Sequence, residues 1–298
     1  MDKKLPKGKG LYVWKIEEMP ANWEDEFQDM GISWVAVKIA NGISSSNRRR
    51  MPDGSKHDTI LGPFTEKAKA AGFLVYGWQY VYCYNPVDEA YKAYERVTKF
   101  ELDGFIIDAE HQCYGKHAQA VQYSTRLRIH LPDTPIGLST YRFPDQHPRL
   151  PYKEFLDICD FNAPQVYWNA GKAGQELAES YEQYLEIKDL PFIPAGRAYY
   201  GEGFPMPTSR EIVHFLNMAQ SIGCPAAFFW SADALWHRLK SLPQIRKAIA
   251  DYEWIGIGDP IPPVEPPSVP TTITLNDLEV QIEDAVYMNT APIKLKKI

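Results

Sequence analysis

The sequence predicts an α/β protein built as a (β/α)8 barrel of the TIM type. Short apolar runs alternate with amphipathic stretches about eight times, and strand–helix repetition of this kind produces a parallel sheet. The runs are almost continuously apolar, as expected of parallel strands that are covered on both faces. Eight such units in about 250 residues fit a closed barrel. The alternative, an open doubly wound sheet, is less well supported because no GxGxxG-type phosphate loop is present.

The predicted strands each contain β-branched or aromatic residues. In chain order they are residues 11–16, 34–40, 73–82, 104–110, 136–142, 161–168, 192–200 and 226–233. Two of the intervening helices have clear signals. Residues 86–101 open with Pro86 and place apolar side chains on one face. Residues 208–223 open with Thr208 and Glu211, which form a capping box, and end at Gly223.

Residues 41–62 form a long polar connection after the second predicted strand. In a barrel this connection would lie at the C-terminal rim, where active-site walls are built. It contains the longest cationic run of the chain, Arg48, Arg49 and Arg50. This run is either a solvated loop or a contact for an anion or a partner.

The barrel is predicted to occupy residues 1–255, followed by a linker at 256–270 with six prolines. Such a segment is extended and stiff. Residues 271–298 are too short for an independent core, yet apolar residues alternate along 272–283. We therefore expect 271–298 to be a docking segment that pairs with another chain's sheet edge. The alternative is a flexible tail without a protein partner.

Composition argues against several classes of function. The formal net charge is -6 and no basic stripe exists, which argues against nucleic acid as a ligand. No apolar run is long enough for a membrane span. The charged N-terminus is not followed by an apolar stretch, so we expect no signal peptide. We expect synthesis in the cytoplasm, with release by lysis or carriage on a phage or injection particle.

Cysteine and histidine spacing suggests neither a metal site nor a cofactor. The seven histidines show no HExxH or paired spacing. The four cysteines are scattered and predicted to be buried or free thiols in a reducing compartment. They are Cys83, Cys113, Cys159 and Cys224.

The strongest local signal is LDGFIIDAEH at residues 102–111. Residues two apart on a strand point to the same face, so Asp108 and Glu110 are both expected to project into the barrel mouth. Two neighbouring acids repel, and one of them should stay protonated near neutral pH. A protonated acid beside an ionised base is the pairing that glycosidic bond cleavage requires. The pair is our candidate catalytic site.

This region resembles two families of glycoside hydrolases. It is similar to the family 25 lysozymes (muramidases), which carry a DxE on the fourth strand of a (β/α) barrel. It also resembles the family 18 chitinases, whose signature is DGxDxDxE. Asp103, Gly104, Asp108 and Glu110 match that signature, and Ile106 replaces its middle aspartate. Residues 75–98 are similar to the third strand and following helix of family 25, and residues 161–168 and 227–233 are similar to elements of both families.

The first strand departs from the family 25 pattern. That family has an aspartate there, whereas this chain reads LYVWKIEEM, with Lys15, Glu17 and Glu18 in the neighbourhood. A lysine at this place would favour ionised Asp108 through opposite-charge attraction.

The resemblance implies that Glu110 is the general acid. Asp108 would then hold or polarise an N-acetyl group, or stabilise an oxocarbenium-like centre. The alternative is that both carboxylates form ion pairs with Lys15, Lys38 or Arg197.

Further candidates for substrate binding lie near the ends of other predicted strands. Each has a structural alternative, either core packing or a surface charge. Asp233 could instead be a helix N-cap, the interpretation that we favour from its residue type. The candidates are Gln165, Tyr167, Trp78, Tyr80, Trp168, Trp230, Tyr141 and Asp233, with Arg142 as an additional rim contact.

Two functions remain open at the level of sequence. The first is a hydrolase of β-linked N-acetylated glycans, with peptidoglycan as the leading substrate and chitin-like glycan as the other. The second is an inactive glycan-binding or structural module of a phage tail or contractile injection particle. The missing first-strand aspartate and the C-terminal segment favour the second.

Overall fold

The computed structural model describes residues 3–201, 203–237 and 241–255, together with three C-terminal strands. The chain divides into two compact units, Met1–Gly258 and Asp259–Ile298, and each is described by itself. The predicted proline-rich linker at 256–270 lies outside the described residues.

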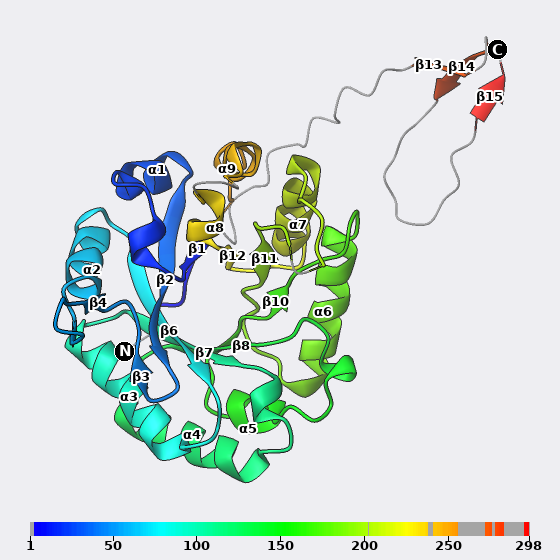
Figure 1. Ribbon diagram of the computed structural model, residues 1–298. Coiled ribbons are helices and arrows are strands. Elements are labelled where there is room, and N and C mark those ends of the chain that lie inside the picture. The colour runs from blue at the N-terminus through cyan, green and yellow to red at the C-terminus, as the bar shows by residue number, and fades with distance from the viewer. Residues whose placement is uncertain are drawn as a thin grey trace. The chain divides into compact units, whose positions relative to one another are not determined.

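The first unit is a (β/α)8 barrel, as predicted, with a ring of parallel strands surrounded by helices (Figure 1). Pro164, which has no N–H to donate, separates the two short strands of the sixth position. That position hydrogen-bonds to its neighbours on both sides, because the Gln165 N–H donates to the Thr140 carbonyl and the Ala195 N–H to the Pro164 carbonyl. These bonds close the ring. Its strands are β1 (Gly8–Val13), β2 (Ile32–Asn41), β6 (Leu74–Val81), β7 (Gly104–Ala109), β8 (Ile136–Ser139), β9 (Phe161–Asn162) with β10 (Gln165–Val166), β11 (Ala195–Arg197) and β12 (Ala226–Trp230).

The helices follow their strands in chain order. Both predicted helix starts are confirmed, since α3 begins at Pro86 and the capping box of Thr208 and Glu211 opens α7. The outer helices are α1 (Trp23–Asp29), α2 (Leu61–Ala70), α3 (Pro86–Lys99), α4 (His117–His130), α5 (Tyr152–Leu156), α6 (Ala173–Ile187), α7 (Ser209–Ser221) and α9 (Pro243–Ala250). Shorter turns are α8 (Ala232–Leu235), η1 (Ile16–Glu18), η2 (His111–Cys113) and η3 (Pro144–Gln146).

Two apolar clusters flank the strands. The larger fills the layer between strands and helices, and the smaller fills the barrel interior with aromatic rings such as Trp34, Tyr76 and Phe161. Gly104 lets one of these rings fit, because a Cβ atom there would lie 2.0 Å from Cε1 of Tyr76. The glycine of the DG motif therefore serves the packing of the interior.

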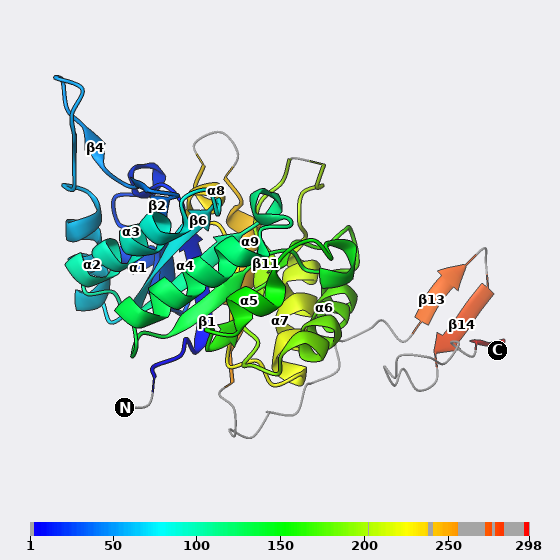
Figure 2. The same cartoon turned by 90° about the horizontal axis from the view of Figure 1, so that it is seen from below.

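The polar connection after β2 carries small strands of its own. β3 (Ser44–Ser45) pairs with the end of β2, while β4 (Arg49–Arg50) and β5 (Lys56–His57) form a hairpin. Figure 2 shows this hairpin projecting from the ring of strands and helices. Arg49 and Arg50 are exposed, in agreement with the solvated-loop interpretation, whereas Arg48 is partly buried.

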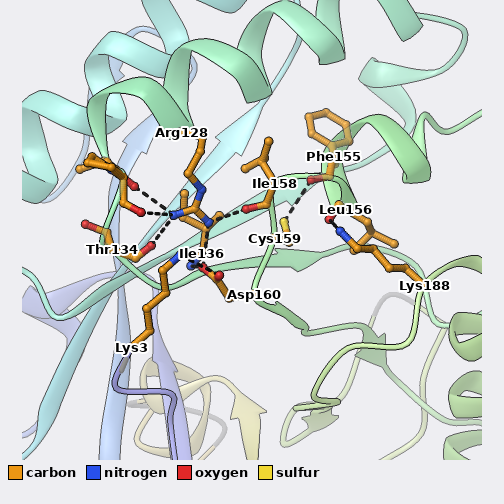
Figure 3. Close-up of polar contacts among 12 residues, drawn as sticks. Lys3, Arg128, Thr134, Ile136, Phe155, Leu156, Ile158, Cys159, Asp160 and Lys188 are labelled. Carbon is orange, nitrogen blue, oxygen red and sulfur yellow. Dashed lines mark hydrogen bonds and ion pairs between the residues drawn. The ribbon is translucent and has the colours of Figure 1, made fainter. Parts of the chain in front are cut away.

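At the amino-terminal ends of the strands, Asp160 organises a network between α4 and β8 (Figure 3). Its carboxylate accepts hydrogen bonds from Lys3 and Arg128 at 2.8 Å and from the Ile136 N–H at 2.9 Å. Arg128 also donates to backbone carbonyls, including that of Thr134 at 2.8 Å. Burial by itself would raise the pKa of Asp160, but these donors hold it below its ordinary value.

All four cysteines are buried, as predicted. Of the helices in the described part of the chain, none combines the length and apolar character that crossing a bilayer demands.

The second unit contains an antiparallel sheet of β13 (Thr272–Leu275), β14 (Leu278–Ile282) and β15 (Leu295–Lys297). β14 is the central strand and pairs with the other two. The alternating segment thus forms strands that pair within this chain.

Candidate active site

Asp108 and Glu110 lie at the carboxyl end of β7. Ile106 belongs to the interior cluster, and the two acids continue its face of the strand at steps of two residues. Asp108 is 5% exposed, whereas Glu110 is only partly buried and comes immediately after the strand, before η2. The predicted alternation therefore places the two carboxylates together, one deeper in the barrel and one nearer the solvent.

Gln165, from β10 across the barrel, joins the two carboxylates. Its side-chain Nε2 donates to Oδ1 of Asp108 at 2.9 Å and to Oε1 of Glu110 at 3.1 Å. Tyr80, at the end of β6, donates from its hydroxyl to Oε2 of Glu110 at 3.4 Å and also contacts the side chain of Gln112. Both residues were predicted at the site. Gln112 was not, because it lies in η2 beyond any strand pattern.

Burial and the neighbouring Glu110 carboxylate raise the pKa of Asp108 well above its ordinary value. Lys38 and the amide of Gln165 oppose this rise. The nearby Glu110 carboxylate and burial both disfavour the ionised form of Asp108, as in other enzyme sites with paired acids. The site can therefore store a proton close to the barrel mouth.

Lys38 is the cation that faces the pair. It follows Trp34 and Ala36 on β2 at two-residue steps, which was the sequence signal for its inward direction. Its ammonium lies 4.6 Å from the Trp78 ring centre and 5.9 Å from that of Tyr80. Burial lowers the pKa of Lys38, while the charges of Asp108 and Glu110 raise it.

The expectation for Lys15 is wrong. Its side chain is about half exposed, and its ammonium contacts Glu18 at 2.6 Å. Among the described residues, no ion pair within 4.0 Å joins Asp108 or Glu110 to Lys15, Lys38 or Arg197. β1 ends at Val13, two residues before Lys15, so this side chain lies beyond the inward-facing part of the strand.

The floor of the site is aromatic. Trp78 is 1% exposed and packs edge-on against Tyr12 and Trp230, with ring centres 5.6 and 5.5 Å away. A ring this deeply buried offers no face to a sugar, so Trp78 supports the site and does not stack on substrate. Tyr12, on β1, was missed because its strand carries no polar motif that draws attention to it.

Trp168 is also not a stacking platform. It is fully buried in the outer layer, 5.1 Å from the ring centre of Phe215 in α7. The neighbouring Tyr167 points the other way, packs against the interior cluster and meets Tyr199 edge-on at 5.6 Å. Successive residues of an extended segment face opposite sides, which separates the two.

Trp230 and Asp233 line a cavity of about 340 Å³, together with Trp14 and Tyr199. Trp230 is partly exposed and its peptide bond to Ser231 is cis. The N-cap interpretation of Asp233 is wrong, because Ser231 holds that position and Asp233 lies in the first turn of α8. Its carboxylate instead accepts the Trp14 N–H at 2.8 Å, and burial raises its pKa.

Tyr141 and Arg142 follow β8 and have structural partners. The Tyr141 hydroxyl accepts the His111 N–H at 2.9 Å, which fixes the backbone just after Glu110. Arg142 contacts the Glu176 carboxylate at 3.2 Å and the carbonyl of Tyr167. Arg142 is therefore a support for the sixth strand position and not a free rim charge.

Within the described residues, no group of three or more His, Cys, Asp or Glu side chains could hold a metal ion. The chemistry available at the site is that of two carboxylates, a primary amide, a phenol and an ammonium group.

No protein-family model and no curated protein match the sequence. Solved structures do match the fold. A Pyrococcus furiosus chitinase catalytic domain aligns with a TM-score of 0.61 at 11% identity, over 83% of this chain and 95% of that one. A Chromobacterium violaceum chitinase gives 0.58 at 10% identity, over 82% and 98%. A family 18 N-acetylglucosaminidase from Paenibacillus barengoltzii gives 0.58 at 11% identity, over 82% and 99%.

These similar structures include family 18 proteins and share the barrel architecture. They agree with the family 18 side of the sequence resemblance and do not support the family 25 assignment. At such low identity they establish the fold alone.

Proposed function

We propose that this chain is a glycoside hydrolase that cleaves β-linked glycans of N-acetylated sugars, with Glu110 as the general acid. The observation that carries the proposal is the carboxylate pair at the carboxyl end of β7, joined by the single amide nitrogen of Gln165. The C-terminal face of a barrel of this type is where active sites occur.

The two carboxylates have different environments, and this difference supports different roles for them in the proposal. Asp108 lies deeper and its raised pKa makes it the group that retains a proton. Glu110 is nearer the solvent, where a glycosidic oxygen can approach it. In the proposed step, the proton held by the pair moves from Asp108 to Glu110 when the glycan binds. Glu110 then donates its proton to the leaving oxygen.

Asp108 acts on the other side of the bond that breaks. Once the pair's proton resides on Glu110, the Asp108 carboxylate can accept a hydrogen bond from an acetamido N–H of the substrate, or stabilise positive charge on the sugar ring. Tyr167, which packs against the interior cluster, is our candidate for a contact with the same acetamido group. Trp230 supplies the partly exposed ring of the adjoining cavity, and this ring is the candidate for sugar stacking.

The leading substrate in this proposal is peptidoglycan, and a chitin-like glycan is the comparison. The similar structures are named as chitinases and an N-acetylglucosaminidase, and one was solved with chito-oligosaccharides. Both glycans contain β-linked N-acetylated sugars, so one acid and one acetamido contact can serve either.

The test is glycan cleavage by wild type and by Glu110→Gln, on purified peptidoglycan and on chito-oligosaccharides. Loss of the acid should lower the rate by about 10² to 10⁴-fold. The free energy of unfolding should change by less than about 1 kcal/mol, because the substitution keeps the side-chain shape.

Glu66→Gln, an exposed position on α2, is the matched control and should retain full activity. Equal rates in wild type and Glu110→Gln would show that Glu110 is not the acid. Glycan binding by a wild-type chain that cleaves neither glycan would favour the alternative, a binding module.

A further inference from the structure

A second cavity of about 340 Å³ opens at the barrel rim between the end of β1 and the polar connection after β2. Four cationic side chains line it, Lys15, Lys38, Arg48 and Lys56, and no acidic residue is among the described residues that line it. The remaining walls are Trp14, Asn41, Ser44, Ser45, Ser46 and Asn47. Hydroxyl, amide and cationic groups are the donors that bind an anion.

Neighbouring acids do not cancel this charge. Arg48 lies 3.5 Å from Asp58, but the same carboxylate contacts Arg96 at 2.5 Å and Lys99 at 2.6 Å. Burial would raise the pKa of Asp58, yet the contacts with Lys99 and Arg96 hold it below its ordinary value. One carboxylate thus serves three cations, which leaves a surplus of positive charge beside the cavity.

Lys15 is balanced by Glu18, with its ammonium 2.6 Å from the carboxylate. Lys56 has different surroundings from Lys15. The backbone carbonyl of Lys56 accepts a hydrogen bond from Arg48, and the Lys56 side chain lies on the exposed hairpin. Arg48 and Lys56 are therefore the two cations that supply the excess positive charge of the cavity, on the side away from the carboxylate pair.

The cavity wall is held in place by Asn47. Its side-chain Nδ2 donates to the carbonyls of Lys38 at 2.8 Å and Trp14 at 3.1 Å. Its Oδ1 accepts the Ile16 N–H at 3.1 Å. These bonds join the polar connection to the ends of both β1 and β2, so the cationic groups are presented from a fixed backbone.

The cavity is next to the carboxylate pair. Lys38 lines the cavity, and its ammonium also lies over the rings of Trp78 and Tyr80. The Tyr80 hydroxyl contacts Glu110. Trp14 and Lys15 line both this cavity and the one that contains Trp230. The two cavities therefore adjoin each other, and Lys38 links this one to the carboxylate pair.

We propose that this cavity is a subsite for a carboxylate substituent of the glycan, bound through Arg48 and Lys56. The inference rests on the proposed function and names its substrate class, an acidic N-acetylated glycan. The lactyl carboxylate of N-acetylmuramic acid has this chemistry, and neutral chitin does not. The subsite thus selects peptidoglycan strands over chitin.

The test measures binding in the Glu110→Gln background, where the ligand stays intact. The probes are the disaccharide GlcNAc-MurNAc, with one lactyl carboxylate, and N,N′-diacetylchitobiose, with none. The parent should bind the acidic probe more tightly. Adding Lys56→Gln should raise the Kd for the acidic probe about fivefold, the effect of one partly exposed ion pair, and a combined Arg48→Gln should raise it further.

The control is Lys67→Gln on α2, which removes an exposed positive charge outside the cavity and should leave both Kd values unchanged. Added salt should weaken binding of the acidic probe selectively. Equal affinity of the parent for the two probes, equal losses for both probes, or no binding of either would overturn the inference.

The proposed function can fail separately. If wild type cleaves neither glycan while charge-selective binding persists, the hydrolase proposal is wrong and the subsite stands. If wild type cleaves both glycans and Lys56→Gln changes their KM values by the same factor, the subsite is wrong and the hydrolase stands.

Discussion

Asp108 and Asp160 lie at opposite ends of the same barrel and are shifted in opposite directions. Asp160, at the amino-terminal ends of the strands, receives hydrogen bonds from Lys3, Arg128 and a backbone N–H, and its pKa is lowered. Asp108, at the carboxyl ends, is more deeply buried, faces Glu110, and has a raised pKa. Asp108 lies within β7, near its carboxyl end, and Asp160 directly precedes β9.

The difference teaches that the balance between burial and hydrogen-bond donors distinguishes a structural acid from a chemical one in this chain. Three donors stabilise the Asp160 charge, which ties α4 to β8. Asp108 shares one amide hydrogen-bond donor, Gln165, with a second carboxylate. Its charged form is therefore poorly stabilised, and it holds a proton that chemistry can use.

The largest expected effect is on the rate of glycan cleavage, through Asp108 at the carboxyl ends of the strands. Asp108→Asn should lower the rate of glycan cleavage by about 10²-fold or more, because it removes the charge that stabilises the transition state. The free energy of unfolding should not fall, since Asn keeps the oxygen that accepts from Gln165 and carries no charge to bury. Cleavage rates and urea unfolding of the same preparations measure both.

The pH dependence of stability sharpens this prediction. A raised pKa means that the Asp108 contribution is complete below the unfolded value of 3.8 and is lost as pH rises toward the folded pKa. Asp108→Asn should remove that loss, so the variant gains stability relative to wild type as pH rises from about 4 toward neutrality. A variant that is less stable than wild type at neutral pH would contradict the raised pKa.

The next largest expected effect is on the free energy of unfolding, through Asp160 at the amino-terminal ends of the strands. Asp160→Asn should destabilise the barrel by about 2 kcal/mol at neutral pH, because Lys3 and Arg128 lose their carboxylate. The sign of the pH dependence is reversed. The Asp160 contribution is complete above 3.8 and is lost as pH falls toward its lowered folded pKa. The wild-type advantage should therefore shrink on acidification, as measured by urea unfolding at several pH values.

Asp157→Asn, at an exposed position three residues earlier, is the control and should change stability by less than about 0.5 kcal/mol. Cleavage by Asp160→Asn should remain near the wild-type rate while the variant is folded. A large loss of activity in folded Asp160→Asn would contradict the separation between a structural acid at the amino-terminal ends and a chemical acid at the carboxyl ends of the strands.

The ring of strands could be predicted from sequence because periodicity and length sufficed. The expected runs coincide with β2, β6 and β7 to within a few residues. The first strand was placed too late, since β1 ends at Val13 while the apolar pattern continues to Ile16. Ile16, after Val13, packs against the outer core as part of a turn. The sequence pattern alone cannot distinguish such an apolar turn from a continuing strand.

The site was predicted where two-residue spacing decides the direction of a side chain. Asp108, Glu110 and Gln165 meet as expected. The prediction of Trp168 as a sugar-stacking ring failed because the segment after β10 places this side chain on the outer face. Lys38 was named only as one of three alternative cations, since its approach to the pair depends on contacts between strands far apart in sequence.

The smallest expected effect is that of ending the chain after Ile255, and it concerns a third charge, Lys9, near the amino-terminal end of β1. Lys9 is 4% exposed and donates to the carbonyls of Ile249 and Tyr252 at 2.6 Å each, and burial lowers its pKa to about 8. A chain ending at Ile255 keeps both acceptors. It should unfold with a free energy within about 0.5 kcal/mol of the full chain, in keeping with the proposal that residues 271–298 are a docking segment outside the barrel.

A chain ending at Ala248 loses both acceptors and should be destabilised by at least about 2 kcal/mol, because a buried ammonium is left without partners. Urea unfolding of the two truncated chains beside the full chain measures the difference. If the chain ending at Ile255 no longer unfolds cooperatively, the barrel needs its C-terminal segment and that segment is not a separate docking unit.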